Sequence, residues 1–452
     1  GRAGMSTMTS VGTVKDQYLA DFDAFERNGA AGSPSWLRGL RQAAIARFAE
    51  LGFPTVREEA WRYTSVAPLV EAGLRPARDE APDTLDADVL ARVDLGGARW
   101  PRLVFVDGRF SATLSSVPAL PTGARVTSLA EALAADGRLV EAHLGRHAAF
   151  GGDGFTALNT AFARDGAVVV LPAGVRLPEP VHLVFVATAG VLAQPRTLVV
   201  AGHGSEATIV EHYLGLAGPA ALTSAVTEVV VGDGALVHHY TLHEQGERAF
   251  HVGTLQVDQD RDSAFRACSA TMGGRLVRSN LGVLLRAEGA SCVLDGLYAI
   301  GGRQHVDNHV TVDHAAPRCA SQQLYKGILD GRSRAVFNGR ILVRRDAQKT
   351  DANQTNKTLL LAEGPEAYSK PQLEIFADDV RCTHGAAEGQ LAEDAIFYLK
   401  SRGLREETAR TLLTYGFARE VIDRIPLEPV RVRLDGRLLA RLRHGRIPEE
   451  TA

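Results

Sequence analysis

Short runs rich in Val, Ile and Leu, separated by turns that contain Gly or Asp, dominate the chain from Gly166 to about Gly385. Such runs have the composition and length of β-strands. Few of the gaps between them leave room for the regular helices that a doubly wound α/β fold requires, and none has a helical pattern. The clearest runs are Val168–Leu171, Val181–Val186, Thr197–Val200, Glu228–Val231, Ala235–Thr241, Val283–Leu285, Val293–Tyr298 and Ala335–Val343.

A weak internal repeat accompanies these runs. Similar turns precede similar strands at intervals of roughly 25–35 residues, which predicts stacked coils that each bury an apolar face on the next. A parallel β-helix accounts for this repeat better than a β-sandwich or barrel, although the pattern alone leaves those alternatives open. The repeated elements are Gly202–Gly204 before Val210–Tyr213, Gly232–Gly234 before Val237–Tyr240, and Leu294–Gly296 echoed by Leu329–Gly331.

The regions on either side of the β-rich segment have helical patterns. Trp36–Leu51 is amphipathic and is followed by Gly52, and Leu391–Arg402 is amphipathic before Gly403. A second C-terminal helix is expected to start near Glu406 and to stop at Gly416. Helices there would cap a stack of coils whose strand edges are otherwise exposed. The expected organisation is therefore a largely helical region at 1–165, a β-helix core at 166–386 and a helical region at 387–452.

Charge and cysteine content limit the classes of partner. The 50 basic and 53 acidic residues give a formal net charge of −3, so no overall basic field attracts nucleic acid or anionic lipid. The 4 cysteines lack CxxC spacing, which is typical of a chain in the reducing cytoplasm without a disulfide framework. No apolar run approaches the roughly 20 residues needed to span a bilayer, and no secretion signal is recognised. We expect a cytoplasmic protein without membrane or nucleic-acid partners.

Three cofactor motifs are present only in fragments. The segment Gly202–Ala207 matches GxGxxA, but a β-type run follows it where a dinucleotide site needs a helix. His243-Glu244 lacks the second histidine of a zinc-protease motif. Asp258, Asp260 and Asp262 resemble the start of a calcium loop without its glycine and final acid. A turn, a strand and a solvated loop are the expected readings.

His305, His309 and His314 form a second candidate for metal binding. In a strand, His305 and His309 would share one face and His314 would lie on the other. Two imidazoles without a third ligand make a poor metal site, so hydrogen-bonded structural histidines are favoured.

The strongest local candidate is Cys382-Thr383-His384. In an extended segment the thiol and the imidazole would project from the same face, whereas on a helix they would diverge. Both groups are ligands for zinc or iron–sulfur species, and together they also form a nucleophile–base pair. Further ligands would have to come from elsewhere in the chain or from a partner. A buried structural cysteine beside a hydrogen-bonded histidine is the alternative.

Several longer segments resemble the SufD family of iron–sulfur cluster assembly subunits. The resemblance covers most of the chain and is most specific between residues 305 and 404. The matching segments are Glu59–Thr64, His305–His309, Asp313–Pro317, Leu324–Gly331, Val336–Gly339, Asp346–Ala352, Lys370–Ile375, Ala377–Gly385, Ala395–Leu399 and Ser401–Leu404.

The resemblance implies a mainly β protein, a right-handed parallel β-helix core flanked by helical N- and C-terminal regions. It also implies a scaffold subunit rather than an enzyme. Members of the SufD family pair with the paralogue SufB and bind the ATPase SufC through C-terminal helices, as the SufBCD complex. A nascent iron–sulfur cluster or iron is expected at a site shared with SufB. A reduced flavin is associated with the related complex, and no residue here is assigned to it; whether the isolated chain forms a homodimer stays open.

The residues Thr355 and Gly385 distinguish the two paralogues. By the resemblance, SufB carries a cysteine near the first position and an acid at the second, and this chain has neither. A threonine hydroxyl cannot carry a persulfide, so the SufD side of the pair is expected. His384 is then the expected iron or cluster ligand that faces SufB, with Cys382 as a weaker companion. The expected anchors for SufC are Leu404, Leu412, Leu413, Phe417 and Val421.

Two enzymatic readings compete with the scaffold. A β-helix carbohydrate-active enzyme would use Asp295, Asp313 or Asp330 as acid–base groups, but it needs paired carboxylates and usually aromatic platforms. Aromatic residues make up only 6% of the chain, which disfavours such a groove. A Cys–His hydrolase would use Cys382 and His384.

Overall fold

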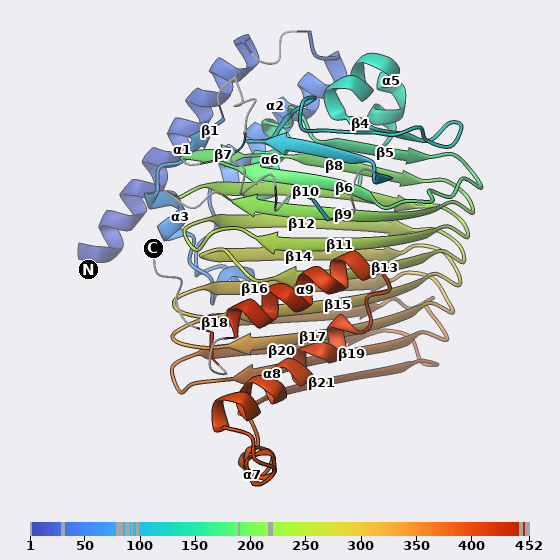
Figure 1. Ribbon diagram of the computed structural model, residues 1–452. Helices are drawn as coiled ribbons and strands as arrows, with labels where there is room; N and C mark the ends of the chain where they lie inside the picture. Colours follow the sequence, from blue (N-terminus) through green and yellow to red (C-terminus); the bar gives the residue numbers. More distant parts are fainter. Residues whose placement is uncertain are drawn as a thin grey trace.

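A parallel β-helix forms the centre of the protein (Figure 1). A computed structural model describes residues 2–28, 32–77, 99–188, 190–215 and 220–442, together with residues 85, 91, 94, 95, 446 and 447. From β8 onward the chain alternates between two sheets, so that consecutive strands lie in opposite walls of one coil. We call the space between the two sheets the lumen.

Sheet A contains the even-numbered strands from β8 onward together with β1, β4, β5 and β7. Its order is β20-β18-β16-β14-β12-β10-β8-β5-β4, with the short strands β1 and β7 beside β10. The bounds are β1 (Arg75–Pro76), β4 (Arg125–Ser128), β5 (Ala167–Leu171), β7 (Val191–Ala193), β8 (Arg196–Ala201), β10 (Leu222–Val231), β12 (Phe250–Gln259), β14 (Leu276–Leu285), β16 (His305–His314), β18 (Arg334–Val343) and β20 (Glu366–Ile375).

Sheet B contains the odd-numbered strands from β9 onward together with β2, β3 and β6, in the order β21-β19-β17-β15-β13-β11-β9-β6-β2-β3. The bounds are β2 (Arg102–Val106), β3 (Arg109–Phe110), β6 (Val181–Ala187), β9 (Glu206–Gly215), β11 (Leu236–Glu244), β13 (Ala264–Thr271), β15 (Ser291–Ile300), β17 (Ala320–Leu329), β19 (Asp351–Leu360) and β21 (Arg381–Gly389).

The strand register confirms the repeat expected from the sequence. In sheet A the same position returns after 28 residues from Leu222 to Phe250, after 29 from Leu276 to His305 and after 32 from Arg334 to Glu366. These pairs are parallel, which confirms the predicted parallel β-helix and rules out the sandwich and barrel alternatives.

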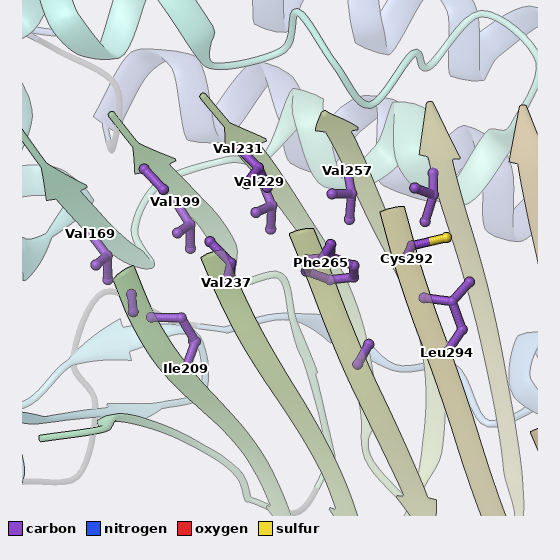
Figure 2. Close-up of a cluster of buried hydrophobic side chains, with 14 of the residues drawn as sticks. Val169, Val199, Ile209, Val229, Val231, Val237, Val257, Phe265, Cys292 and Leu294 are labelled. Atoms are coloured by element: carbon purple, nitrogen blue, oxygen red, sulfur yellow. The ribbon is translucent and has the colours of Figure 1, made fainter. Parts of the chain in front are cut away.

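Rows of aliphatic side chains fill the first turns of the lumen. Val169, Val199, Val229 and Val257 occupy one in-register row of sheet A, and all are buried. Ile209, Phe265 and Leu294 meet them from sheet B (Figure 2). Residues two apart along a strand share a face, so the register also identifies the inward positions of the later strands.

The turns between the sheets explain the glycines of the repeat. Gly204 and Gly234 have φ values of +61° and +62°, a conformation that L-residues rarely adopt. Successive turns stack on one another, because the Gly204 amide donates to the Asp233 carbonyl at 2.8 Å and the Gly234 amide to the Arg261 carbonyl at 2.8 Å. The turn at Gly202–Ser205 leads into β9 rather than a helix, as the sequence predicts.

Helices of the N-terminal region pack mainly against sheet A. The predicted helix at 36–51 is confirmed as α2, which ends at Gly52 with φ +65°. Local caps start two others: Ser128 and Glu131 form a capping box on α5, and Asp153 accepts from two backbone N–H groups of α6. The bounds are α1 (Arg2–Asn28), α2 (Ser35–Leu51), the 3-10 helix η1 (Glu59–Trp61), α3 (Ala67–Glu71), α5 (Leu129–His143) and α6 (Gly154–Ala161).

Three C-terminal helices follow the coil: α7 (Glu393–Ser401), α8 (Glu406–Ile422) and α9 (Glu428–Arg441). Helices α8 and α9 lie on the outward face of sheet B, whereas α7 lies beyond β21 (Figure 1). The expected stop at Gly416 is wrong, because α8 continues through it. Burial of Ala418, Val421 and Ile422 against sheet B offsets the cost of about 1 kcal/mol for a glycine inside a helix.

The two ends of the coil differ. At one end α5 packs against β4, β5 and β8, and the short strands β3 and β4 pair antiparallel with their neighbours. At the other end, within the described residues, β20 pairs only with β18 and β21 only with β19. We call this the open end. In the part of the chain that the structure describes, no helix has the length and apolar character needed to cross a membrane.

Candidate functional site at the open end of the coil

Cys382 and His384 lie on β21, the last strand of sheet B. Their in-register neighbours on β19 are Ala352 and Gln354, which are buried in the lumen. Cys382 packs against a cluster that includes Val343 from the opposite sheet, so it faces inward, and alternation gives His384 the same face. The two side chains therefore project together into the mouth of the lumen.

The backbone around His384 is exposed. Every described residue of β21 except the half-buried Cys382 is exposed, whereas β20 is half-buried apart from its exposed end residues Glu366 and Ile375. Edge strands of this kind present unpaired N–H and C=O groups to any chain that can add a strand. Pro371 on β20 and the charged ends of β21 are features that limit unspecific pairing.

The Cys382 thiol is a weaker candidate than the imidazole. Burial and the nearby Asp351 carboxylate raise its pKa above the ordinary value. A thiol with a raised pKa is less often present as the thiolate, which is the form that binds metal or attacks a substrate. In the described residues, no group of three or more His, Cys, Asp or Glu side chains could hold a metal ion. A metal at His384 would therefore need ligands from outside the described part of the chain.

Thr355 and Gly385 are direct cross-strand partners on β19 and β21. Both lie on the outward face of sheet B, opposite to the face of His384. A Cβ atom at Gly385 would meet nothing within 4 Å, so the position has room for the side chain that it lacks. The two positions that the resemblance expects to differ in SufB are thus neighbours, but a wall of the coil separates them from the imidazole.

The three histidines of β16 are part of the structure's hydrogen bonding. His305 and His309 face outward, where Nε2 of His305 lies 3.0 Å from the Thr64 hydroxyl and Nε2 of His309 lies 3.0 Å from Asp307. His314 faces inward, with Nε2 2.9 Å from the Ser321 hydroxyl. Burial lowers the pKa of His305 and of His314 to about 4 in each case. They have the structural role favoured by the sequence.

The candidate acids of a carbohydrate-active enzyme do not meet. Asp295 lies on the outward face of sheet B near Arg424, Asp313 lies on sheet A paired with Arg344, and Asp330 follows β17. Of the other partial motifs, Asp258 is bound to His147 at 2.8 Å and Glu244 to Arg433 at 2.7 Å. Paired carboxylates across a groove, which glycoside hydrolysis needs, are not formed by these residues.

A latch from the N-terminal region crosses sheet A as far as the open end. Its residues are Glu59–Thr64. Trp61 packs against Arg278, Thr64 donates to Asp307 at 2.6 Å, and Tyr63 stacks on Tyr368 of β20 at 4.4 Å between ring centroids. The latch and the strands enclose a cleft of about 560 Å³. In the sequence, this segment is recognisable only by its resemblance to the family, which assigns it no role.

The expected anchors on the C-terminal helices differ in accessibility. Val421 is buried, and Phe417 is half-buried over the Lys326 ammonium at 4.1 Å. Leu404 and Leu413 are half-buried, and Leu412 is exposed. Phe397 and Tyr398 on α7 were not among the expected anchors, although they are 73% and 57% exposed. On a helix, the two residues that follow a buried residue point away from its face, and both follow the buried Ile396 directly.

Comparisons with known proteins agree with the geometry. A family model described as "SUF system FeS cluster assembly, SufBD core domain" matches residues 184–417, and one for the "SufBD protein N-terminal region" matches residues 12–183. A SufBD family iron–sulfur cluster assembly protein of Synechocystis is 34% identical over 411 residues, which cover 88% of this chain and 90% of the relative. The iron–sulfur cluster assembly proteins SufD of Escherichia coli and Bacillus subtilis are 29% and 25% identical, each over 93% of this chain and 96% of the relative. The chain therefore belongs to the SufBD family of iron–sulfur cluster assembly proteins.

Proposed function

We propose that this chain acts in iron–sulfur cluster assembly as the SufD-type scaffold subunit, which pairs with a SufB-type paralogue at the open end of the coil. The observation that carries the proposal is that both sheets end there in edge strands, the half-buried β20 and the exposed β21, while the other end is covered by α5. A paralogue with the same coil would present matching edges. Strand-to-strand pairing would then satisfy the backbone groups of both chains.

In this arrangement His384 supplies one ligand to iron or to the nascent cluster, which is cargo of the complex and not a resident cofactor. The support is its position on the edge strand, its exposure and its projection into the mouth of the lumen. Imidazole suits ferrous iron, and the remaining ligands would come from the partner. Cys382 is secondary because of its raised pKa. No step catalysed by this chain alone is part of the proposal.

The ATPase SufC would dock on α7 and the start of α8. Phe397, Tyr398 and Leu412 are large exposed apolar side chains on these two adjacent helices, and exposed clusters of this kind mark interaction sites. Val421 and Phe417 would support the surface from below rather than touch the partner. ATP hydrolysis belongs to SufC.

The first experiment is co-expression with SufB and SufC, followed by purification through a tag on this chain. Co-purification of both is the expected result, and a chain that stays alone would overturn the scaffold role. His384→Ala should leave assembly intact and lower the iron and sulfide of the purified complex. Thr383→Ala, which changes the outward neighbour on the same strand, is the matched control and should leave the cluster content unchanged.

A separate pair of variants tests the helical surface. Phe397→Ala with Tyr398→Ala should weaken SufC binding at least tenfold without loss of SufB. Val432→Ala on α9, another exposed apolar side chain, should not change either interaction. Unchanged SufC binding in the α7 variant would rule out this docking site.

A further inference from the structure

A row of polar side chains lies in the lumen directly beneath His384. The register aligns Gln323 of β17, Gln354 of β19 and His384 of β21 at one inward position. In-register neighbours on adjacent strands are about 4.8 Å apart. Gln354 therefore lies directly between His384 and the deeper part of the lumen. The same row continues through Leu294 and Ala267.

The two carboxamides of this row are buried and lack partners. Gln323 is 2% and Gln354 0% exposed, and within the described residues neither the amide oxygen nor the amide nitrogen of either side chain makes a hydrogen bond. Gln354 reaches across the lumen to β18, where a Cβ atom on Gly339 would lie 1.5 Å from its Nε2. Glycine at 339 is therefore what makes room for this side chain. Asn356, at the next inward position, has an unpaired oxygen as well.

Unpaired polar atoms at this depth indicate ordered water. Buried amides without partners are costly and rare, and buried water is their usual partner. The lining of the row is neutral, which favours water over an ion. A cavity of about 50 Å³ lies further along the lumen and reaches Tyr325, the in-register neighbour of Asn356. That volume is enough for about three water molecules.

A histidine that binds a metal through one ring nitrogen nearly always donates the other N–H to a carbonyl, a carboxylate or a water. Among the described residues, the Gln354 carboxamide is the inward neighbour of His384 in the row and has its oxygen available. We propose that Gln354 is the positioning residue of His384. One imidazole N–H donates to a luminal water, this water donates to Oε1 of Gln354, and the second ring nitrogen stays deprotonated and points to the partner.

This inference deepens the proposed ligand role of His384 and rests on it for its purpose, but its test does not. The full chain, labelled with ¹⁵N-histidine, would be studied by long-range ¹H–¹⁵N NMR at pH 8, with His384→Ala to assign the signals. The expected wild-type spectrum has one ring tautomer of His384. Gln354→Leu should give a mixture of both tautomers, whereas Gln354→Glu, which keeps an acceptor, should keep the single tautomer. Gln322→Leu, which removes an exposed outward amide from β17, is the control and should match the wild type.

The iron content of the complex with SufB and SufC provides the second readout. Gln354→Leu should lower iron at least twofold with assembly intact, and Gln354→Glu should restore it. A wild-type tautomer ratio in Gln354→Leu would overturn the positioning role even if His384→Ala loses iron. Conversely, unchanged iron in His384→Ala would overturn the proposed ligand role, while a changed tautomer ratio in Gln354→Leu would still support the contact between the two side chains.

Discussion

Tyr298 of β15 lies against Gly327 of β17, its in-register neighbour in the lumen. The relationship is reversed two positions earlier, where Tyr325 of β17 lies against Gly296 of β15. A Cβ atom at Gly327 would come within 2.0 Å of the Tyr298 ring, and one at Gly296 within 2.2 Å of the Tyr325 ring. In each pair the glycine has no side chain, and this leaves space in the lumen for the tyrosine ring of the neighbouring strand.

The first prediction concerns this packing. Gly327→Ala should destabilise the chain by about 1–3 kcal/mol, because overpacking forces the ring or the strand to move. Thermal unfolding would measure the loss. Gly389→Ala on the exposed strand β21, where a Cβ atom meets nothing within 4 Å, should be close to neutral. Replacing Tyr298 with Leu in the Gly327→Ala background should recover part of the stability; equal effects of the two glycine variants would contradict the packing argument.

The sequence predicted the coil because its turns repeat, but it did not reveal the strands at the open end. Strand β19 has the sequence Asp351-Ala352-Asn353-Gln354-Thr355-Asn356, which lacks apolar alternation. Its inward position Gln354 carries an amide in a row that holds Leu294 and Ile209 in earlier turns, so a pattern search for aliphatic runs passes over it. The inward amides that make β19 hard to recognise as a strand in the sequence are the same residues that form the polar row beneath His384.

The C-terminal helices show a second limit. Gly416 is a helix-stop signal in the sequence, and packing on sheet B overrides it. Helix α9 was not expected, although Pro429 at its start and buried Val430, Leu434 and Leu438 at four-residue spacing are usable signals. The pair formed by Cys382 and His384 was recognisable from its spacing, whereas the separation of Thr355 from His384 by the sheet required the register.

The second prediction concerns Asp307, which anchors the latch. Its carboxylate contacts Arg278 at 2.6 Å and accepts from Thr64. Asp307→Asn should cost about 3–5 kcal/mol, since it leaves a buried guanidinium without its counter-charge. Asp313→Asn on the same strand is the matched control, because its pair with Arg344 is more exposed, and it should cost at most about 1 kcal/mol. Urea unfolding would measure the free energy of unfolding of both variants. Equal small losses would show that the Asp307 contact contributes no more than a surface ion pair.

Acid should weaken the same anchor. Burial alone would raise the pKa of Asp307, but the Arg278 charge and hydrogen bonds from His309 and Thr64 outweigh it and lower the pKa to about 2. The unfolded chain binds this proton near pH 4, so the stabilisation is complete above that pH and is lost as the pH falls towards 2. The difference in melting temperature between the wild type and Asp307→Asn should shrink over this range.

The third prediction concerns the buried histidines. Burial lowers the pKa of His243 and of His314 to about 4, whereas an unfolded histidine titrates near 6.5. Between these values the unfolded chain binds more protons, so stability is complete above pH 6.5 and falls as the pH drops towards 4. Each such group should cost on the order of 2 kcal/mol at pH 5.

His314→Gln tests this dependence, because glutamine can keep the hydrogen bond to Ser321 without titrating. Its melting temperature should fall less than that of the wild type between pH 7 and pH 5, and the difference between the two proteins should be constant above pH 7.5. Parallel curves over the whole range would show that His314 has the same pKa in the folded and unfolded states.

The last prediction concerns how α9 is held on the coil. Both Glu244 carboxylate oxygens accept from Arg433, at 2.9 and 2.7 Å, and the carboxylate is 3% exposed. Burial alone would raise the pKa of Glu244, but Arg433 and His212 lower it well below the ordinary value. Arg433→Ala should therefore destabilise the docking of α9 by about 3 kcal/mol, because a buried carboxylate loses its bidentate partner. Hydrogen–deuterium exchange should rise at least tenfold in α9 and remain unchanged in β16 on the opposite wall.

Arg410→Ala, which removes exposed ion pairs on α8, is the control and should leave exchange in α9 as it is. If Arg433→Ala leaves exchange in α9 unchanged, apolar contacts of Val430, Leu434 and Leu438 alone hold the helix, and the ion pair contributes nothing to its docking.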